Sequence, residues 1–148
     1  KRNNAVASTE VKSFEHLICT EQLSRRLGFK VGEELIRVVR VRSLNGNARQ
    51  VDHGYFLESI AKGLTPEIAA KSIYDYLEHK RGVKVMASRR TVSVELANDE
   101  DCNYLDLGKY NCVAVMESQS YTSDGILFEV THARTHPEIF HYRVNSKR

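Results

Sequence analysis

Residues 36–56 read IRVVRVRSLNGNARQVDHGYF, and this stretch decides the fold because it predicts a long β-hairpin. Two apolar runs flank an Asn-Gly-Asn segment at residues 45–47, which is a strong short-range signal for a hairpin turn. Side chains of a strand alternate between its two faces, so Arg40 and Arg42 leave the same face of the first strand. The sequence therefore predicts a hairpin that carries two cations side by side.

Two neighbouring guanidinium groups repel each other, so they must reach water or share an anion. One interpretation is a solvated edge strand whose basic side faces outward. The other is a binding site, because a phosphate or carboxylate accepts bidentate hydrogen bonds from a pair such as Arg40 and Arg42. The hairpin by itself favours neither interpretation.

The length of the turn decides whether an acid joins the two arginines. A two-residue loop at Asn45 and Gly46 places Asp52 on the face opposite Arg40, whereas a three-residue loop with a bulge places Asp52 on the same face. We predict the three-residue loop, because an acid beside two arginines makes a polar cluster that can hold both charge and hydroxyl groups.

Composition limits the class of protein. The chain has 148 residues, the size of one domain with a single core, and its net charge of +3 is scattered, unlike that of a DNA-binding domain. No apolar run approaches the roughly 20 residues that span a bilayer, and the first residues do not have the pattern that predicts a signal peptide. The three cysteines, Cys19, Cys102 and Cys112, are odd in number and widely spaced, so we expect free thiols in a reducing cytoplasm. Because no long apolar run is present, we also expect no membrane partner.

Local patterns predict the order strand, helix, hairpin, helices, strand, helix, hairpin, strand. This order indicates an α+β domain built on a mostly antiparallel sheet. Outside the first hairpin, the predicted strands cover residues 6–18, 83–97, 112–122, 126–135 and 140–144. The predicted helices cover residues 20–28, 65–79 and 98–108, and each begins beside a capping side chain.

The second predicted helix has two interpretations. Residues 72–75, Ser-Ile-Tyr-Asp, match a capping box, so a new helix can begin at Ser72. Its free backbone N–H groups and the Ser72 hydroxyl would then form a small anion site. The alternative is one continuous amphipathic helix with Ser72 exposed, and the local pattern slightly favours this alternative.

Other candidate chemistry is weak. His132 and His136 share only the even spacing of a strand face, and no His-Glu-x-x-His pattern accompanies them, so we predict no metal site. No phosphate-binding loop, dinucleotide fingerprint or nucleophile elbow appears, so we predict no cofactor. Glu129 stands in the middle of a predicted strand, where it either faces water or pairs with arginine or ligand hydroxyl groups.

Several motifs, taken in order, resemble the effector-binding UTRA domain of GntR/HutC-type bacterial repressors. The likeness covers nearly the whole chain from about residue 11, and the block at residues 72–78 looks like that of trehalose-operon repressors. The motifs are RVR at residues 40–42, NG at 45–46, DHGYF at 52–56, SIYDYLE at 72–78 and FE at 128–129.

The resemblance implies a fold similar to chorismate lyase, an antiparallel sheet with flanking helices. It implies that residues 1–148 form a single effector-binding domain, and that an N-terminal winged-helix DNA-binding domain lies outside this chain. It further implies a homodimer that senses a small anionic effector, often a sugar phosphate such as trehalose 6-phosphate. DNA would then be contacted only through the absent domain, and the domain itself would catalyse no reaction.

The resemblance also implies roles for single residues. Arg40 and Arg42 match the pair that grips the anionic group of the effector. Ser72 matches a serine at a helix N-terminus that meets the same group, and Tyr74 matches a nearby aromatic residue. These matches favour the helix break at Ser72 and the three-residue hairpin loop.

Further predicted site residues follow from the same resemblance. Asp52 and Glu129 match acidic positions that accept hydrogen bonds from sugar hydroxyl groups. Ala87 stands where many members carry an arginine, and Arg89 is predicted to replace it from the same strand face. Arg134, which continues the strand of Glu129, completes the predicted effector site.

Two other function classes stay open at this stage. One is an enzyme similar to chorismate lyase that acts on a small anionic metabolite, with Glu129 or Asp52 as general base. The other is a dimerisation module whose pocket is vestigial. Likeness of fold does not separate a sensor from an enzyme, because one fold hosts many functions.

Overall fold

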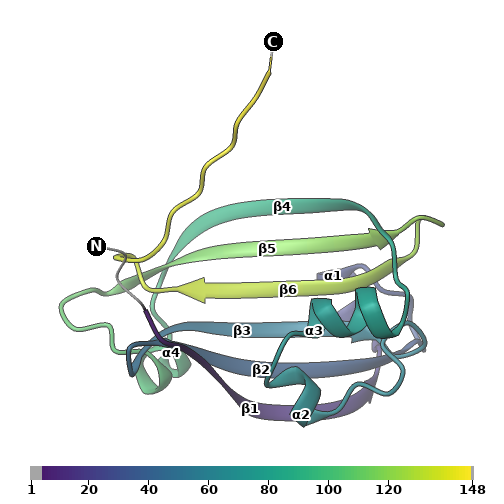
Figure 1. Ribbon diagram of the computed structural model, residues 1–148, viewed down its shortest axis with the longest axis horizontal. Coiled ribbons are helices and arrows are strands. Elements are labelled where there is room, and N and C mark those ends of the chain that lie inside the picture. Colours follow the sequence, from purple (N-terminus) through teal and green to yellow (C-terminus); the bar gives the residue numbers. More distant parts are fainter. Residues whose placement is uncertain (1–4, 148) are drawn as a thin grey trace.

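The computed structural model describes residues 5–147, and in this part six strands form one antiparallel sheet (Figure 1). The strands lie in the order β1-β2-β3-β6-β5-β4, so the two sequential hairpins meet where β3 pairs with β6. The predicted α+β class is confirmed. The strands are β1 (Ala7–Ile18), β2 (Glu34–Leu44), β3 (Asn47–Leu57), β4 (Val85–Leu96), β5 (Cys112–Thr122) and β6 (Leu127–Thr135).

Short helices cover both faces of this sheet. On the face that we call the α3 face lie α2 (Pro66–Ala69), α3 (Ile73–Asp75) and the π-helical segment η1 (Tyr76–Lys80). On the other, the α4 face, lie α1 (Glu21–Leu27) and α4 (Asp99–Tyr104). In Figure 1, α3 lies in front of the sheet and α1 lies behind it.

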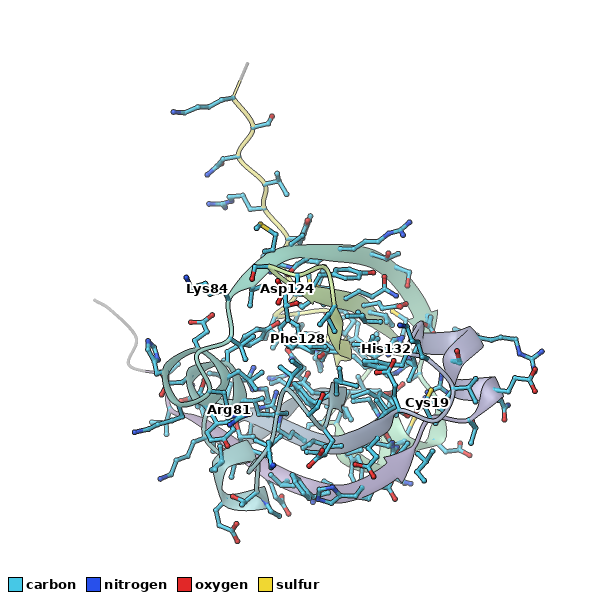
Figure 2. All side chains as sticks on the ribbon, turned by 90° about the vertical axis from the view of Figure 1, so that its right-hand side faces the viewer. Cys19, Arg81, Lys84, Asp124, Phe128 and His132 are labelled. Carbon is cyan, nitrogen blue, oxygen red and sulfur yellow. The ribbon has the colours of Figure 1, made fainter. Side chains whose placement is uncertain are left out.

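The apolar core follows the strand alternation. Figure 2 shows Phe128 in the middle of the molecule, whereas Arg81 and Lys84 lie at its left-hand side. A larger cluster joins the sheet to α1, α2 and α3, and a smaller one lies beneath α4. Members of the larger cluster include Leu27, Leu35, Phe56, Ile73, Leu77 and Phe128, and members of the smaller one include Val39, Val51, Leu105 and Val113.

The β2–β3 hairpin turns over two residues, so the predicted three-residue loop is wrong. Asn45 and Gly46 both have positive φ values, 52° and 82°, and the flanking Leu44 and Asn47 pair with each other. Two positive φ angles are the signature of the turn type that matches the right-handed twist of the strands. The local chemistry of Asn-Gly therefore determined the turn.

A β-bulge nevertheless brings Asp52 to the arginine side. Arg42 pairs with Gln50 but the next pair joins Ser43 to Ala48, so one residue of β3 is left over between them. This extra residue shifts the register by one and places Asp52 directly opposite Arg40. The predicted position of Asp52 is confirmed, although the bulge and not the loop produces it.

The helix break at Ser72 is confirmed. The helix α2 ends at Ala69, and Ser72 has an extended backbone, as an N-cap residue does. Its Oγ accepts a hydrogen bond from the backbone N–H of Asp75 at 3.1 Å. A capping side chain therefore starts a second helix, which continues through η1.

The predicted strand over residues 140–144 is wrong for the single chain. Residues 140–147 have no regular secondary structure, and in Figure 1 they leave the sheet. A strand needs a neighbouring backbone for its hydrogen bonds, and within the described chain none lies beside this segment. The helix predicted over residues 98–108 ends at Tyr104, and all three cysteines are free. No helix in residues 5–147 is long and apolar enough to cross a bilayer.

Candidate functional site

A cavity of about 250 Å³ lies on the α3 face, between the sheet and the start of α3. Strand residues of the same parity line it, because alternate side chains of β2, β3, β5 and β6 point to this face. Six of the eight predicted site residues meet here from four separate elements. They are Arg40, Arg42, Asp52, Ser72, Tyr74 and Glu129.

One carboxylate serves two guanidinium groups in this cavity. The Oδ2 atom of Asp52 lies 3.6 Å from Nη2 of Arg40 and 4.0 Å from Nε of Arg42. Its other oxygen accepts a hydrogen bond of 2.6 Å from Gln50. The side chain of Arg40 is only 14% exposed, and burial lowers its pKa while the charge of Asp52 opposes that effect. Positive charge is therefore left over on two arginines that line a cavity.

The beginning of α3 faces the same cavity. Ser72, Ile73 and Tyr74 all line it, and Ile73 and Tyr74 are the first two helical residues. N–H groups at the start of a helix have no acceptor within the helix and favour negative charge nearby. The Arg40 guanidinium reaches the same region, since its Nη1 lies 3.4 Å from the carbonyl oxygen of Ala69 at the end of α2.

Glu129 presents a buried oxygen that has no donor. Its Oε1 accepts hydrogen bonds of 2.9 Å from the Tyr74 hydroxyl and 2.9 Å from the Thr131 hydroxyl, whereas Oε2 is buried without a partner among the described residues. Burial raises the pKa of the Glu129 carboxyl, and hydrogen bonds from Tyr74 and Thr131 oppose this. Burial and the charge of Glu129 also raise the pKa of Tyr74 to about 12. The cavity thus offers an acceptor for a ligand hydroxyl group, next to a neutral phenol.

Arg90 lines the cavity and Arg89 does not, so the prediction for Arg89 is corrected. Arg90 pairs with Ser118, which also lines the cavity, while Arg89 pairs with Gln119 on the α4 face. Arg90 is close enough to oppose the rise in the pKa of Glu129. The alternation of valines later in β4 has the same parity as Arg90, and this signal could have identified it.

Arg134 is also absent from the cavity, for the same reason of parity. It points to the α4 face, where its Nε and Nη2 each donate a 2.9 Å hydrogen bond to the fully buried carboxylate of Asp101. Its Nη1 lies 3.2 Å from Glu95. Arg134 therefore joins α4 to the sheet and is not part of the candidate site.

A second hollow of about 510 Å³ lies on the α4 face, and its charges are largely paired. There Arg37 pairs with Glu15 at 2.9 Å, and His53 contacts Glu100. In residues 5–147, no group of three or more histidine, cysteine or acidic side chains is arranged to hold a metal ion. The cavity on the α3 face is the stronger candidate, because two of its arginines share one acid, whereas Arg37 and Arg134 each pair with an acid of their own.

The chain is similar to known proteins in sequence and in fold. The family model of the UTRA domain matches residues 2–141. Over 123 residues, 83% of this chain and 52% of the relative, the sequence is 28% identical to the HTH-type transcriptional regulator TreR of Bacillus subtilis. It is 22% identical over 135 residues to the HTH-type transcriptional repressor NagR of the same organism, of which it covers 55%. The chain therefore spans about half the length of these curated relatives.

The fold matches solved structures closely. The effector binding domain of the B. subtilis trehalose repressor TreR superposes with a TM-score of 0.88 at 27% identity, covering 95% of this chain and 98% of that one. The effector domain of PhnF from Mycobacterium smegmatis has a TM-score of 0.84 at 15% identity and shares the fold. From the family match over nearly its whole length, this chain belongs to the UTRA domain family, the effector-binding domains of GntR-type transcription regulators.

Proposed function

We propose that this domain senses a small anionic effector, a sugar phosphate such as trehalose 6-phosphate, on behalf of a transcription repressor. One observation carries the proposal: Arg40, Arg42 and Arg90 line one cavity, and among the described residues only Asp52 forms an ion pair with a guanidinium there. A dianionic phosphate would balance this charge. A phosphorylated amino sugar, which belongs to the same chemical class, is the alternative effector.

The effector would lie across the cavity with its two ends recognised differently. Its phosphate would lie against Arg40, Arg42 and the first N–H groups of α3, because planar guanidinium groups bind phosphate oxygens in pairs. Its hydroxyl groups would approach Glu129, whose buried Oε2 atom has no donor among the described residues. A buried acceptor without a partner costs about 1–3 kcal/mol, so a ligand that supplies the donor regains that energy.

Regulation would follow from differential binding to two arrangements of the domain. An effector shifts such an equilibrium only by its difference in affinity, and typical allosteric coupling is on the order of 1–3 kcal/mol. In a homodimer the shift would change the spacing of paired DNA-binding domains outside this chain, and spacing determines how two half-sites are engaged. Such a regulator would act in the bacterial cytoplasm.

An enzyme is the second candidate, and Glu129 is the observation that favours it. A buried carboxyl with a raised pKa inside a cavity is the usual environment of a general base. The same carboxyl serves equally well as an acceptor in a sensor. Only the fate of the ligand distinguishes the two functions.

A thermal-shift panel of trehalose 6-phosphate, other phosphorylated sugars, inorganic phosphate and unphosphorylated trehalose tests the proposal. A true effector at about 100 times its Kd raises the free energy of unfolding by roughly 2.7 kcal/mol, whereas trehalose should give little change. The ligand is then recovered and checked by NMR. Full recovery supports a sensor, consumption supports the enzyme, and no stabilisation by any phosphorylated sugar contradicts both.

A further inference from the structure

Two guanidinium groups meet at one tyrosine in the hollow of about 510 Å³ on the α4 face. Arg26, near the end of α1, and Arg37 of β2 both donate to the hydroxyl of Tyr55 in β3, each at 3.2 Å. Each guanidinium carbon also lies 5.9 Å from the centre of the Tyr55 ring. The two donating nitrogen atoms are therefore no further apart than twice a hydrogen-bond length, although they come from different elements.

The donors at this point exceed the acceptors. Arg37 forms an ion pair with Glu15 at 2.9 Å, whereas Arg26 forms no ion pair with any residue in 5–147. The Tyr55 oxygen accepts from both arginines, and within the described chain the hydrogen of its own hydroxyl has no acceptor. Arg26 is exposed as a residue, yet the phenol holds its guanidinium at the rim of the hollow. An unpaired cation and a neutral O–H donor thus face the same space.

Two histidines continue this group along the sheet. His53 of β3 and His132 of β6 are direct neighbours in the register, and both line the hollow. His53 contacts Glu100 of α4, and Nε2 of His132 lies 3.4 Å from Glu117 of β5. Burial lowers the pKa of His132 and Glu117 opposes this, while the charges of Arg26 and His53 lower the pKa further. An anion in the hollow would therefore favour the protonated form of His132.

We propose that this hollow is a second ligand site, in which Arg26, Arg37 and the Tyr55 hydroxyl bind the phosphate or carboxylate group of a small molecule. Guanidinium groups bind the oxygen atoms of such anions through pairs of charge-assisted hydrogen bonds. The phenol adds a donor without adding charge. The site is separate from the effector cavity, because no described residue lines both. It therefore does not depend on the proposed function.

The two sites lie on opposite faces of the same strand. Asp52 and Phe56 of β3 line the effector cavity, whereas His53 and Tyr55, at alternate positions, line the hollow. In Figure 2, His132 is on the same side of the molecule as Cys19, which comes shortly before α1. A shared strand is a physical route by which one ligand could affect the other, so each site needs its own readout.

Histidine NMR with added sulfate tests the proposal at the hollow itself. Sulfate is a tetrahedral anion that stays fully charged across roughly pH 5–8, where histidines titrate. At constant ionic strength, the ring signals of His53 and His132, assigned from single His→Gln variants, should shift with sulfate until they saturate. The pKa of His132 should rise in the bound state, because the anion stabilises its charged form. The same titration with malonate compares a carboxylate ligand with the tetrahedral one.

Three variants show which residues hold the anion. Arg26→Ala should raise the dissociation constant read at the His132 signal at least about tenfold, as expected for the loss of a charged hydrogen bond. The matched control is Arg25→Ala, which removes the adjacent arginine of α1 that does not line the hollow, and it should leave the constant unchanged. Arg40→Ala, which alters only the effector cavity, should also leave it unchanged.

Four results would overturn the proposal. These are a lack of saturation with both anions, an unchanged constant in Arg26→Ala, an equal loss in Arg25→Ala, which indicates general charge attraction, and an equal loss in Arg40→Ala, which places the anion in the effector cavity. Failure of the proposed function would look different. The thermal shift with phosphorylated sugars would then be absent, while the sulfate-dependent shift of the His132 signal would persist.

Discussion

The two faces of the sheet each hold an arginine–carboxylate cluster, and the two clusters are paired to different degrees. On the α4 face, Arg134 donates two hydrogen bonds of 2.9 Å to Asp101, whose carboxylate is fully buried. On the α3 face, Arg40 and Arg42 share Asp52 at 3.6 and 4.0 Å. We call the first the closed cluster, because its charges are paired at hydrogen-bond distance. We call the second the open cluster, because positive charge remains beside a cavity.

This difference separates a structural cluster from a binding site built of the same residue types. Two opposite charges that form an ion pair in the interior hold secondary-structure elements together. Removing either charge leaves the other buried and without a counter-charge. Cations that exceed their acids at a cavity are available to an anion. The predictions below test whether the two clusters differ in this way.

The largest expected effect is on the closed cluster. Replacing Asp101 by Ala should lower the free energy of unfolding by roughly 3–5 kcal/mol, because it leaves the Arg134 guanidinium unpaired and also removes part of the α4 cap. Chemical denaturation measures this. The matched control is Glu95→Ala, which removes the exposed partner of the same arginine and should cost less than about 1 kcal/mol. Equal effects of the two changes would mean that Arg134 is not held chiefly by Asp101.

On the open cluster, the main effect should fall on effector affinity. Replacing Arg40 by Ala should weaken a phosphorylated effector by about 1.5–3 kcal/mol, the range for hydrogen bonds to charged groups. Stability should change much less than in Asp101→Ala, because Asp52 keeps Arg42 and Gln50. Isothermal titration and denaturation of the same variant give both numbers. Unchanged affinity would remove Arg40 from the site.

Glu129→Gln should raise stability in a pH-dependent way. Because burial raises the pKa of Glu129, the folded domain holds this proton more tightly than the unfolded chain, and stability falls as pH rises from the ordinary carboxyl pKa through the raised one. Glutamine does not titrate, so the variant does not lose this stability as the pH rises. We expect the variant to be more stable by about 1–2 kcal/mol at about pH 8, and nearly equal to the parent protein at about pH 4. An equal difference at both pH values would contradict a titrating Glu129.

The smallest expected effect distinguishes the two neighbouring arginines of β4. Arg90→Ala should weaken effector binding by about 1 kcal/mol, since the side chain lines the cavity but is exposed to solvent. Arg89→Ala is the matched control on the other face and should leave affinity unchanged. Titration of both variants decides the matter, and a larger loss in the Arg89 variant would reverse the assignment of faces.

Much of the fold was predictable because the signals are local. The Asn45-Gly46 turn follows from two residues that tolerate positive φ, and Thr20, Thr65 and Asn98 each cap a helix as their sequence neighbours indicate. Ser72 was ambiguous, since a capping box and a continuous helical pattern overlap in residues 65–79. The family resemblance favoured the break, and the structure confirmed it.

The candidate site was predictable only in part, because strand faces depend on register. Asp52 reaches Arg40 through a bulge that the turn sequence does not encode, and Arg89 and Arg134 were assigned to the cavity although they point away from it. One residue more or less in a strand exchanges its two faces. The segment at residues 140–144 shows the same limit: its alternation was visible, but the described chain offers it no neighbouring strand.

By itself, the sequence determined the class of the fold, the hairpin and the helix caps, because these follow from chemistry within a few positions of each residue. The six residues that meet at one cavity were predicted through the family resemblance. Only the tertiary structure decided that Arg90 joins the cavity, that Asp101 neutralises Arg134, and that Oε2 of Glu129 has no donor in residues 5–147. The pairing of charges is set by residues far apart in the chain, so no local pattern states which charge is left over.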